Sequence, residues 1–141
     1  MSIKEKQEAL VKEFEQLMDW EDKYQYIIKL GRELPPLPEE FRSDKYKIEG
    51  CQSQLWIIAK LENGKLVFYA DSDAMIVKGL IAILIKIYSG ETPEEILSNP
   101  PDFLKKMGIE NHLSPTRKNG LSSMIKQIQM YAVAFNALKK K

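Results

Sequence analysis

Two apolar segments separated by an Asn-Gly pair are the feature that most constrains the fold of this chain. The segments span residues 54–61 and 65–70, and Asn63-Gly64 lies at the centre of the connection between them. Asn and Gly tolerate the positive φ angles of a two-residue type I′ turn, which joins antiparallel strands. The turn therefore predicts a β-hairpin with a defined register. The predicted cross-strand pairs are Glu62–Lys65, Ala59–Phe68, Ile57–Ala70 and Leu55–Ser72.

The first third of the chain carries two helical patterns before the hairpin begins. Asp19 is placed to cap the second of these helices, and the Pro-Pro-Leu-Pro run at 35–38 ends it, because proline donates no backbone hydrogen bond. Residues 45–49 could add a short strand just before Gly50. The first helix is predicted from an apolar stripe of Leu10, Phe14, Leu17 and Met18.

Helical signals resume after the second strand of the hairpin. Asp71-Ser72-Asp73 is predicted to cap an apolar helix that ends at Tyr88. A last long helix begins either after Ser114, with Pro115 in its first turn, or later, near Leu121. Helices around a small antiparallel sheet, with no internal repeat, predict a single α+β domain over residues 1–141.

The charge balance and the apolar runs exclude several classes of protein. Lys and Arg number 21 against 20 Asp and Glu, which leaves no basic field for general nucleic-acid binding. The most apolar run, residues 76–88, is too short to cross a bilayer as a helix, and the N-terminus lacks the apolar core of a signal peptide. We therefore expect a cytoplasmic protein that binds neither nucleic acid nor membrane.

Cys51 is the single cysteine of the sequence. An intramolecular disulfide is therefore excluded, and so are metal sites and clusters that this chain would have to bind through several of its own cysteines. His112 is also the single histidine, so that no histidine pair can hold a metal. We predict no metal site, and for His112 we predict a surface position or a structural role.

The neighbours of Cys51 distinguish it from an ordinary buried cysteine, which is the commonest role of a lone thiol. Gly50 permits a sharp turn before it, and Gln52 and Ser53 are too polar for a core. The hairpin register also places Cys51 near the start of the helix that follows Asp73, where backbone N–H groups favour a thiolate. These features favour a reactive thiol.

Two charged residues are candidates for work beside this cysteine. Asp73 can accept hydrogen bonds from loop N–H groups, which predicts that it holds the loop of residues 50–54 against the helix. The alternative is that Asp73 only caps its own helix. A helix that starts at Pro115 would place Arg117 in the first turn, where a cation costs about 0.3–1 kcal/mol. In that case Arg117 is expected to bind a partner or to stabilise the cysteine loop. If the helix starts later, near Leu121, Arg117 lies in a loop.

Four sequence motifs carry a resemblance to a known family. They are YQYIIKLG at 24–31, GCQSQLW at 50–56, DSDAMIVKGL at 71–80 and HLSPTR at 112–117. In this order they resemble the SufE family of sulfur-acceptor proteins, over roughly residues 14–135. The resemblance implies a fold similar to that of IscU-type scaffolds, with a curved antiparallel sheet covered by helices.

The resemblance also implies a function, in which Cys51 is the sulfur acceptor and carries a persulfide intermediate. The donor would be a pyridoxal-phosphate cysteine desulfurase of the SufS type, which the protein stimulates, and the receiver a SufBCD-like iron–sulfur scaffold complex. The pyridoxal phosphate belongs to the desulfurase, so no cofactor is expected here. Whether the free protein forms a homodimer stays open. The residues expected to form the loop and the partner-binding surface are Gly50, Gln52, Ser53, Asp73 and Arg117.

Two other functions remain compatible with a single reactive cysteine. The protein could activate the desulfurase by contact alone, with Cys51 incidental. It could also be a thiol redox sensor in which Cys51 is oxidised to a sulfenic acid. If a Cys51→Ser variant still stimulates the desulfurase, activation by contact is favoured. If Cys51 reacts faster with peroxide than with a persulfide donor, a redox sensor is favoured.

Overall fold

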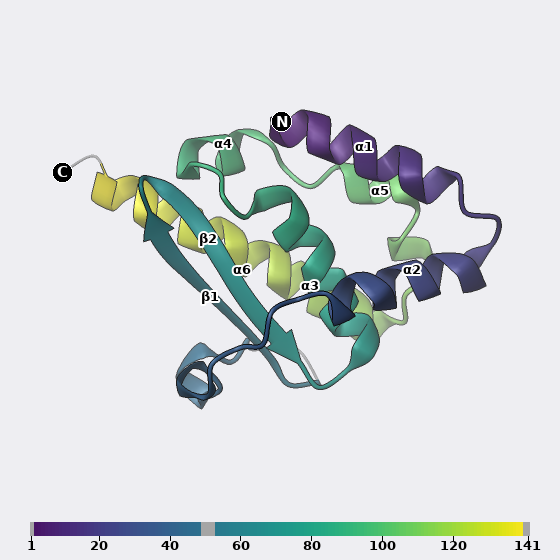
Figure 1. Cartoon of the computed structure of the whole chain (residues 1–141), viewed down its shortest axis with the longest axis horizontal. Helices are drawn as coiled ribbons and strands as arrows, with labels where there is room; N and C mark the ends of the chain where they lie inside the picture. Colours follow the sequence, from purple (N-terminus) through teal and green to yellow (C-terminus); the bar gives the residue numbers. More distant parts are fainter. Residues whose placement is uncertain (1, 49–52, 140–141) are drawn as a thin grey trace.

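The computed structural model describes residues 2–48 and 53–139. Six α-helices, three short 3-10 helices and one antiparallel β-hairpin occur in these residues, which confirms the predicted α+β class (Figure 1). In chain order the elements are α1 (Ile3–Glu15), α2 (Trp20–Arg32), η1 (Glu39–Phe41), η2 (Asp44–Tyr46), β1 (Leu55–Glu62), β2 (Lys65–Ser72), α3 (Met75–Tyr88), α4 (Pro93–Ser98), α5 (Phe103–Met107), η3 (Glu110–His112) and α6 (Pro115–Lys139).

The hairpin has the predicted turn and the predicted register. Asn63 and Gly64 both have positive φ angles, 53° and 80°, as a type I′ turn requires. Leu55 lies opposite Ser72, and Glu62 lies opposite Lys65. The pairs Ala59–Phe68 and Ile57–Ala70 are also present. A local dipeptide thus sets the alignment of the two strands along their whole length.

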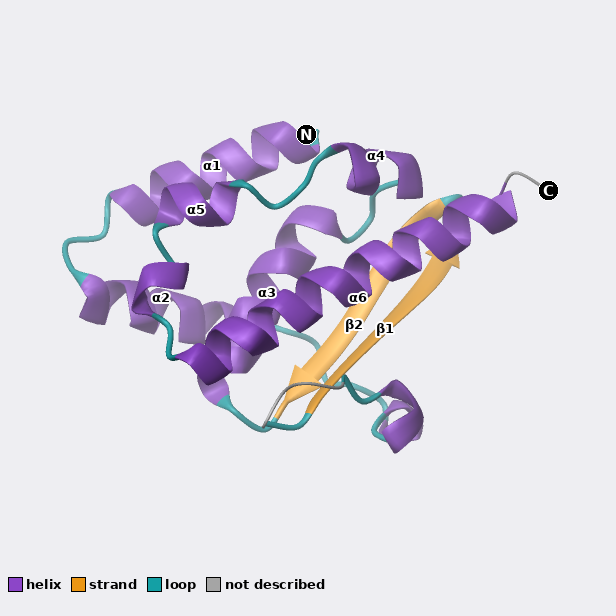
Figure 2. Ribbon diagram, turned by 180° about the vertical axis from the view of Figure 1, so that it is seen from behind, coloured by secondary structure: helices purple, strands orange, loops and turns teal. Residues whose placement is uncertain are grey.

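Both faces of the hairpin are covered, which explains why β1 begins with four buried apolar residues. One face packs on α3 and α6, and α1 and α2 lie beyond α3 (Figures 1 and 2). Leu55 and Ile57 belong to this main core. The other face carries a smaller apolar cluster, covered by the segment that contains η1 and η2. The buried members of that cluster are Leu37, Trp56 and Ile58, with Phe41, Tyr46 and Tyr69 packed against them.

Helices α2 and α3 touch backbone to backbone at a pair of glycines. A Cβ atom built on Gly79 would lie 2.3 Å from the backbone oxygen of Ile27, and one on Gly31 would lie 2.8 Å from the backbone nitrogen of Gly79. Real Cβ atoms are not found this close to backbone atoms, so the crossing depends on the absence of both side chains. The close packing fixes the position of α3, whose start lies at the candidate site.

Helix caps agree with the sequence at two positions and differ from it at a third. Asp19 caps α2 by accepting a hydrogen bond from the backbone N–H of Asp22 at 2.9 Å. Helix α6 begins at Pro115, because Ser114 Oγ accepts from the backbone N–H of Arg117 at 3.3 Å. The predicted cap of α3 by Asp71–Asp73 is wrong: its N-cap is Ala74, and no side chain caps it.

Two further predictions are corrected by the structure. Residues 44–46 form η2 rather than a strand, and the pairing with β1 is reduced to one bridge between Lys47 and Trp56. Glu49, the end of that predicted strand, lies outside the described residues. Met18 is 90% exposed because α1 ends at Glu15, so it does not belong to the apolar stripe of that helix.

No helix in the described part of the chain is both long and apolar enough to cross a membrane.

Candidate functional site

The predicted site residues Gly50, Cys51 and Gln52 lie outside the described residues, so the site is built from the segments on either side of them. The backbone N–H of Ile48 donates a hydrogen bond to the backbone oxygen of Leu55 at 2.8 Å. Ile48 and Leu55 are both buried. This contact joins the two ends of the segment that contains the cysteine, and anchors them at the start of β1.

The far end of the cysteine segment is also attached to the start of α3. The backbone N–H of Gln54 donates to Asp73 Oδ1 at 2.9 Å, and the backbone N–H of Asp73 donates to the Gln54 oxygen at 3.3 Å. Ser72 Oγ donates to the same oxygen at 2.6 Å. The Asp73 carboxylate therefore accepts from a backbone N–H of the loop, as predicted, while Ser53, half-buried, precedes this contact.

We expect Asp73→Arg to speed the alkylation of Cys51 by iodoacetamide with little change in melting temperature. The substitution removes the acceptor that holds Gln54 and places a cation at the start of α3, where the helix dipole disfavours it. Asp73→Asn keeps an oxygen acceptor and should react at nearly the wild-type rate. Equal alkylation rates in wild type and Asp73→Arg would show that the contact does not govern access to the thiol.

Asp71, next to the contact between Gln54 and Asp73, forms ion pairs that were not predicted from the sequence. Asp71 lies opposite Trp56 in the hairpin and is 8% exposed. It forms ion pairs with the guanidinium of Arg42 and with Lys78 Nζ, the latter at 3.2 Å. Arg42 comes from the segment of η1 and η2, and Lys78 from α3. The network thus joins three parts of the chain next to Ser72 and Asp73.

These contacts determine how Asp71 titrates. Burial acts to raise the pKa of its carboxyl, but hydrogen bonds from the Ser72 backbone, Lys78 and Arg42 outweigh burial, so that the pKa lies below its usual value. A carboxyl with a lowered folded-state pKa stabilises the protein above its unfolded pKa of about 3.9. That stabilisation is lost as the pH falls through the folded-state pKa.

Asp71→Asn is therefore expected to lower the free energy of unfolding at pH 7 by about 1–3 kcal/mol, because it removes the buried counter-charge that Arg42 and Lys78 share. The difference between wild type and variant should shrink as the pH falls below about 4, where the unfolded chain takes up a proton on Asp71, and should be lost once the pH passes the lowered folded-state pKa. Urea unfolding at both pH values measures this. A difference that does not depend on pH would indicate lost packing rather than lost charge.

Arg117 lines an open hollow of about 400 Å³ together with the first residues of α3. Among residues 2–48 and 53–139, Arg117 has no ion-pair partner, and it is exposed. The hollow is closed on one side by Tyr24, whose hydroxyl donates to the backbone oxygen of His112. The residues that line it are Tyr24, Ile28, Ala74, Met75, Ile76 and Arg117.

His112, whose backbone oxygen accepts the hydrogen bond of Tyr24, is itself held by two contacts of its ring. Its ring stacks on Trp20 with 3.5 Å between the ring centroids, and its Nδ1 lies 3.3 Å from the backbone oxygen of Gly108. The stacking on Trp20 holds the turn before α6 against α2, and the contact with Gly108 joins that turn to the end of α5. These contacts are those of a structural histidine, one of the two possibilities predicted for it.

We expect Arg117→Ala to weaken about tenfold the binding of the desulfurase that the resemblance implies as a partner, and to leave the melting temperature nearly unchanged. The reason is that the guanidinium is exposed and available for a carboxylate of a partner. Lys118→Ala is the matched control, since Lys118 is an exposed cation that does not line the hollow. Titration calorimetry measures the binding. A parallel loss of binding and of stability would assign Arg117 to the fold.

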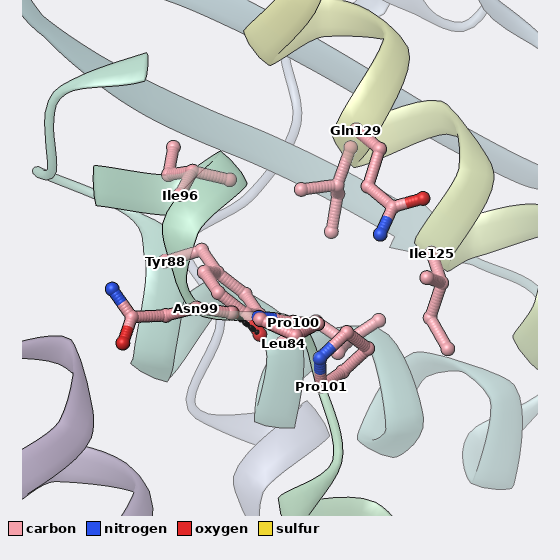
Figure 3. Close-up of a pocket in the computed structure, with 9 residues that line it drawn as sticks. Leu84, Tyr88, Ile96, Asn99, Pro100, Pro101, Ile125 and Gln129 are labelled. Carbon is pink, nitrogen blue, oxygen red and sulfur yellow. Dashed lines mark hydrogen bonds between the residues drawn. The ribbon is translucent and has the colours of Figure 1, made fainter. Parts of the chain in front are cut away.

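The cavity drawn in Figure 3 is enclosed between α3, α4 and α6 and is too small to be a substrate site. Its volume is about 10 Å³, close to the minimum for one water molecule. The hydroxyl of Tyr88 donates to the backbone oxygen of Asn99 at 2.7 Å beside it, and burial raises the pKa of Tyr88 to about 12. This cavity is a packing feature of the core.

Comparison with known proteins decides the family. The family model for SufE, described as the Fe-S metabolism associated domain, matches residues 8–132. The chain belongs to the SufE family. A similar solved structure is the solution structure of a hypothetical protein from Thermus thermophilus, with 25% sequence identity and a TM-score of 0.76. The similarity covers 92% of this chain and 94% of that one.

Membership in SufE associates this chain with iron–sulfur metabolism. It also confirms the resemblance of the four sequence motifs to this family. Within this SufE chain, the structure brings Gln54 to Asp73 and places Arg117 in a hollow lined by the first residues of α3.

Proposed function

We propose that this SufE chain accepts a sulfur atom as a persulfide on Cys51 from a pyridoxal-phosphate cysteine desulfurase, and delivers it to an iron–sulfur scaffold complex. One observation supports it above the others. The single cysteine of a SufE chain lies in a segment whose ends are anchored by the Ile48–Leu55 and Gln54–Asp73 hydrogen bonds. Such anchors limit how far a group between them can move, which suits a group that must meet two partners in turn.

The transfer needs only one cysteine on this chain. The Cys51 thiolate attacks the outer sulfur of the persulfide on the desulfurase, a new S–S bond forms, and the old S–S bond breaks. The desulfurase thiolate leaves with the electron pair, so that the sulfur moves without net oxidation or reduction. A second nearby thiol would instead attack the new persulfide, form a disulfide and release sulfide.

The start of α3 suits the negative charge of this chemistry. Its first backbone N–H groups receive no side-chain cap, and the helix dipole favours an anion at this end. Asp73 opposes this effect, but its carboxylate is engaged by the Gln54 N–H. We propose that the thiolate or persulfide of Cys51 is stabilised by the start of α3 when a partner is bound.

The same proposal assigns roles to the partner and the surrounding residues. Pyridoxal phosphate acts on the desulfurase, and this chain needs no cofactor of its own. Gly50, Gln52 and Ser53 help to present the thiol to the partner, and Arg117 with its hollow contacts the desulfurase. Transfer of the sulfur to this chain also accounts for stimulation of the desulfurase, because removal of the sulfur frees the active-site cysteine of the desulfurase for another cycle.

Intact mass spectrometry tests the proposal directly. After incubation with cysteine and the desulfurase, the chain should gain about 32 Da per sulfur atom, and a reductant should remove the added mass. Omission of cysteine or of the desulfurase is the control. A chain that stimulates the desulfurase fully and gains no mass would contradict the proposed transfer.

A further inference from the structure

The outer face of the C-terminal half of α6 carries an apolar stripe that no described residue covers. Met130, Val133 and Leu138 are 55%, 57% and 61% exposed. Ala134 and Ala137, also exposed, fill the positions between them. The spacing i, i+3, i+4, i+7 and i+8 places all five on one side of the helix. We call these five residues the outer stripe of α6.

The opposite side of α6 is already committed to the core. Leu121, Met124, Ile128 and Ala132 are almost fully buried, and Tyr131 donates a hydrogen bond to the backbone oxygen of Ile57 at 3.0 Å. The C-terminal half of α6 is therefore apolar on both sides. A helix with this pattern is normally buried on both sides, which indicates that the outer stripe is covered in a complex.

The outer stripe also contains a hollow that fits a side chain. Its volume is about 310 Å³, and its walls are almost entirely apolar. Lys126 stands at one end of it. The residues that line it are Lys126, Gln129, Met130, Val133 and Ala134.

The charges of α6 select the partner. Residues 115–139 contain four cations, Arg117, Lys118, Lys126 and Lys139, and no Asp or Glu, and two more lysines follow. A second copy packed on this stripe would bring like charges together. A bilayer surface is favoured by large apolar anchors such as Trp, Phe and Leu, of which the outer stripe has only Leu138.

We propose that the outer stripe of α6 binds an acidic amphipathic helix of a protein partner. The apolar face of that helix would cover Met130, Val133 and Leu138, and its carboxylates would be attracted to Lys126 and to the excess positive charge of α6. The stripe lies about 20–35 Å along α6 from Pro115, at about 1.5 Å per residue. The end of α6 lies near the turn of the hairpin, at the other end of the sheet from the start of α3 (Figure 2). A partner can thus hold this surface while the cysteine end is occupied by another.

The probe for this proposal is a synthetic helix of about 15 residues with leucines on one face and glutamates elsewhere. Amide chemical-shift changes in the labelled chain should be confined to residues 126–138, and the affinity should fall as salt is raised. The same peptide with lysine in place of glutamate should bind at least about tenfold more weakly. Equal binding of both peptides, or shifts elsewhere, would overturn the proposal.

Two variants make the test specific. Val133→Glu should reduce binding of the acidic peptide about tenfold or more, because it places a carboxylate within the stripe. Met18→Glu is the control, since Met18 is apolar and 90% exposed but lies outside α6. Both variants should accept sulfur from the desulfurase like wild type, so this test and that of the proposed function fail independently.

Two other results would also overturn the proposal. Sedimentation that shows a dimer of wild type, lost in Val133→Glu, would assign the stripe to a second copy of the chain. Stronger shifts of residues 126–138 with phosphatidylglycerol vesicles than with the acidic peptide would assign it to a membrane surface.

Discussion

Replacing Cys51 with serine is expected to abolish sulfur acceptance and to leave the fold intact. Serine has no thiolate to attack the outer sulfur of a persulfide, and its hydroxyl is not ionised at neutral pH. Little packing should be lost, because the neighbours of Cys51 in the sequence are glycine and polar residues. Circular dichroism reports the fold, and a labelled-sulfur assay with the desulfurase reports the transfer.

Cys51→Ala is the companion variant, because it removes the thiol without adding a hydroxyl. Undiminished transfer in either folded variant would contradict the proposed role of Cys51. Full stimulation of the desulfurase by both variants, without transfer, would favour an activator that works by contact. If wild-type Cys51 reacts faster with peroxide than with a persulfide donor, a redox sensor becomes the better description.

The second large effect is expected in stability, from Gly79→Ala. The new methyl group would lie 2.3 Å from the backbone oxygen of Ile27, and neither backbone can yield without moving a helix. We expect a loss of about 3 kcal/mol in the free energy of unfolding, although alanine is the better helix former by about 1 kcal/mol. Urea unfolding monitored by circular dichroism measures it.

Gly64→Ala is the matched control for this glycine substitution. Gly64 has a φ of +80° but no atom within 4 Å of an added Cβ. Its replacement should therefore cost only the backbone strain of the left-handed conformation, about 1–2 kcal/mol. If Gly79→Ala lowers the free energy of unfolding no more than Gly64→Ala does, the predicted effect of close packing at Gly79 is contradicted.

The parts of the fold that were predictable depend on short-range chemistry. Asn63 and Gly64 define a turn type, and the turn type defines the strand register, so that Leu55 opposite Ser72 follows from two residues. Asp19 caps a helix within one turn of itself. In both cases the interacting groups are neighbours in the sequence, and the local pattern is sufficient.

The errors arise where a distant residue competes for a local group. Asp71 and Asp73 have the sequence of a helix cap, but Arg42 pairs with the first and Gln54 binds the second. Arg42 lies 29 residues before Asp71, and no periodicity connects them. The position of Asp71 near the end of an apolar strand could have indicated the ion pair, because a buried charge needs a partner.

The candidate site was predictable in part for the same reason. The hairpin register predicts that the residues before Leu55 lie beside those after Ser72, and Gln54 does bind Asp73. The ion pair below them and the hollow beside Arg117 depend on tertiary packing of α2, α3 and α6. The spacing of the outer stripe of α6 could also be seen in the sequence. It was not predicted, because the buried apolar residues on the opposite side of α6 were enough to predict the helix.

The hydrogen bond between Ile48 and Leu55 fixes both ends of the segment that contains Cys51, so the number of residues between them limits where the sulfur can lie. Loop-closure entropy grows only with the logarithm of length, so one inserted residue between these ends would cost little folding free energy. The same insertion could displace the sulfur by up to about 3.5 Å, which exceeds the S–S bond length of about 2 Å. The length of this segment is therefore constrained by the reach of a sulfur atom rather than by stability.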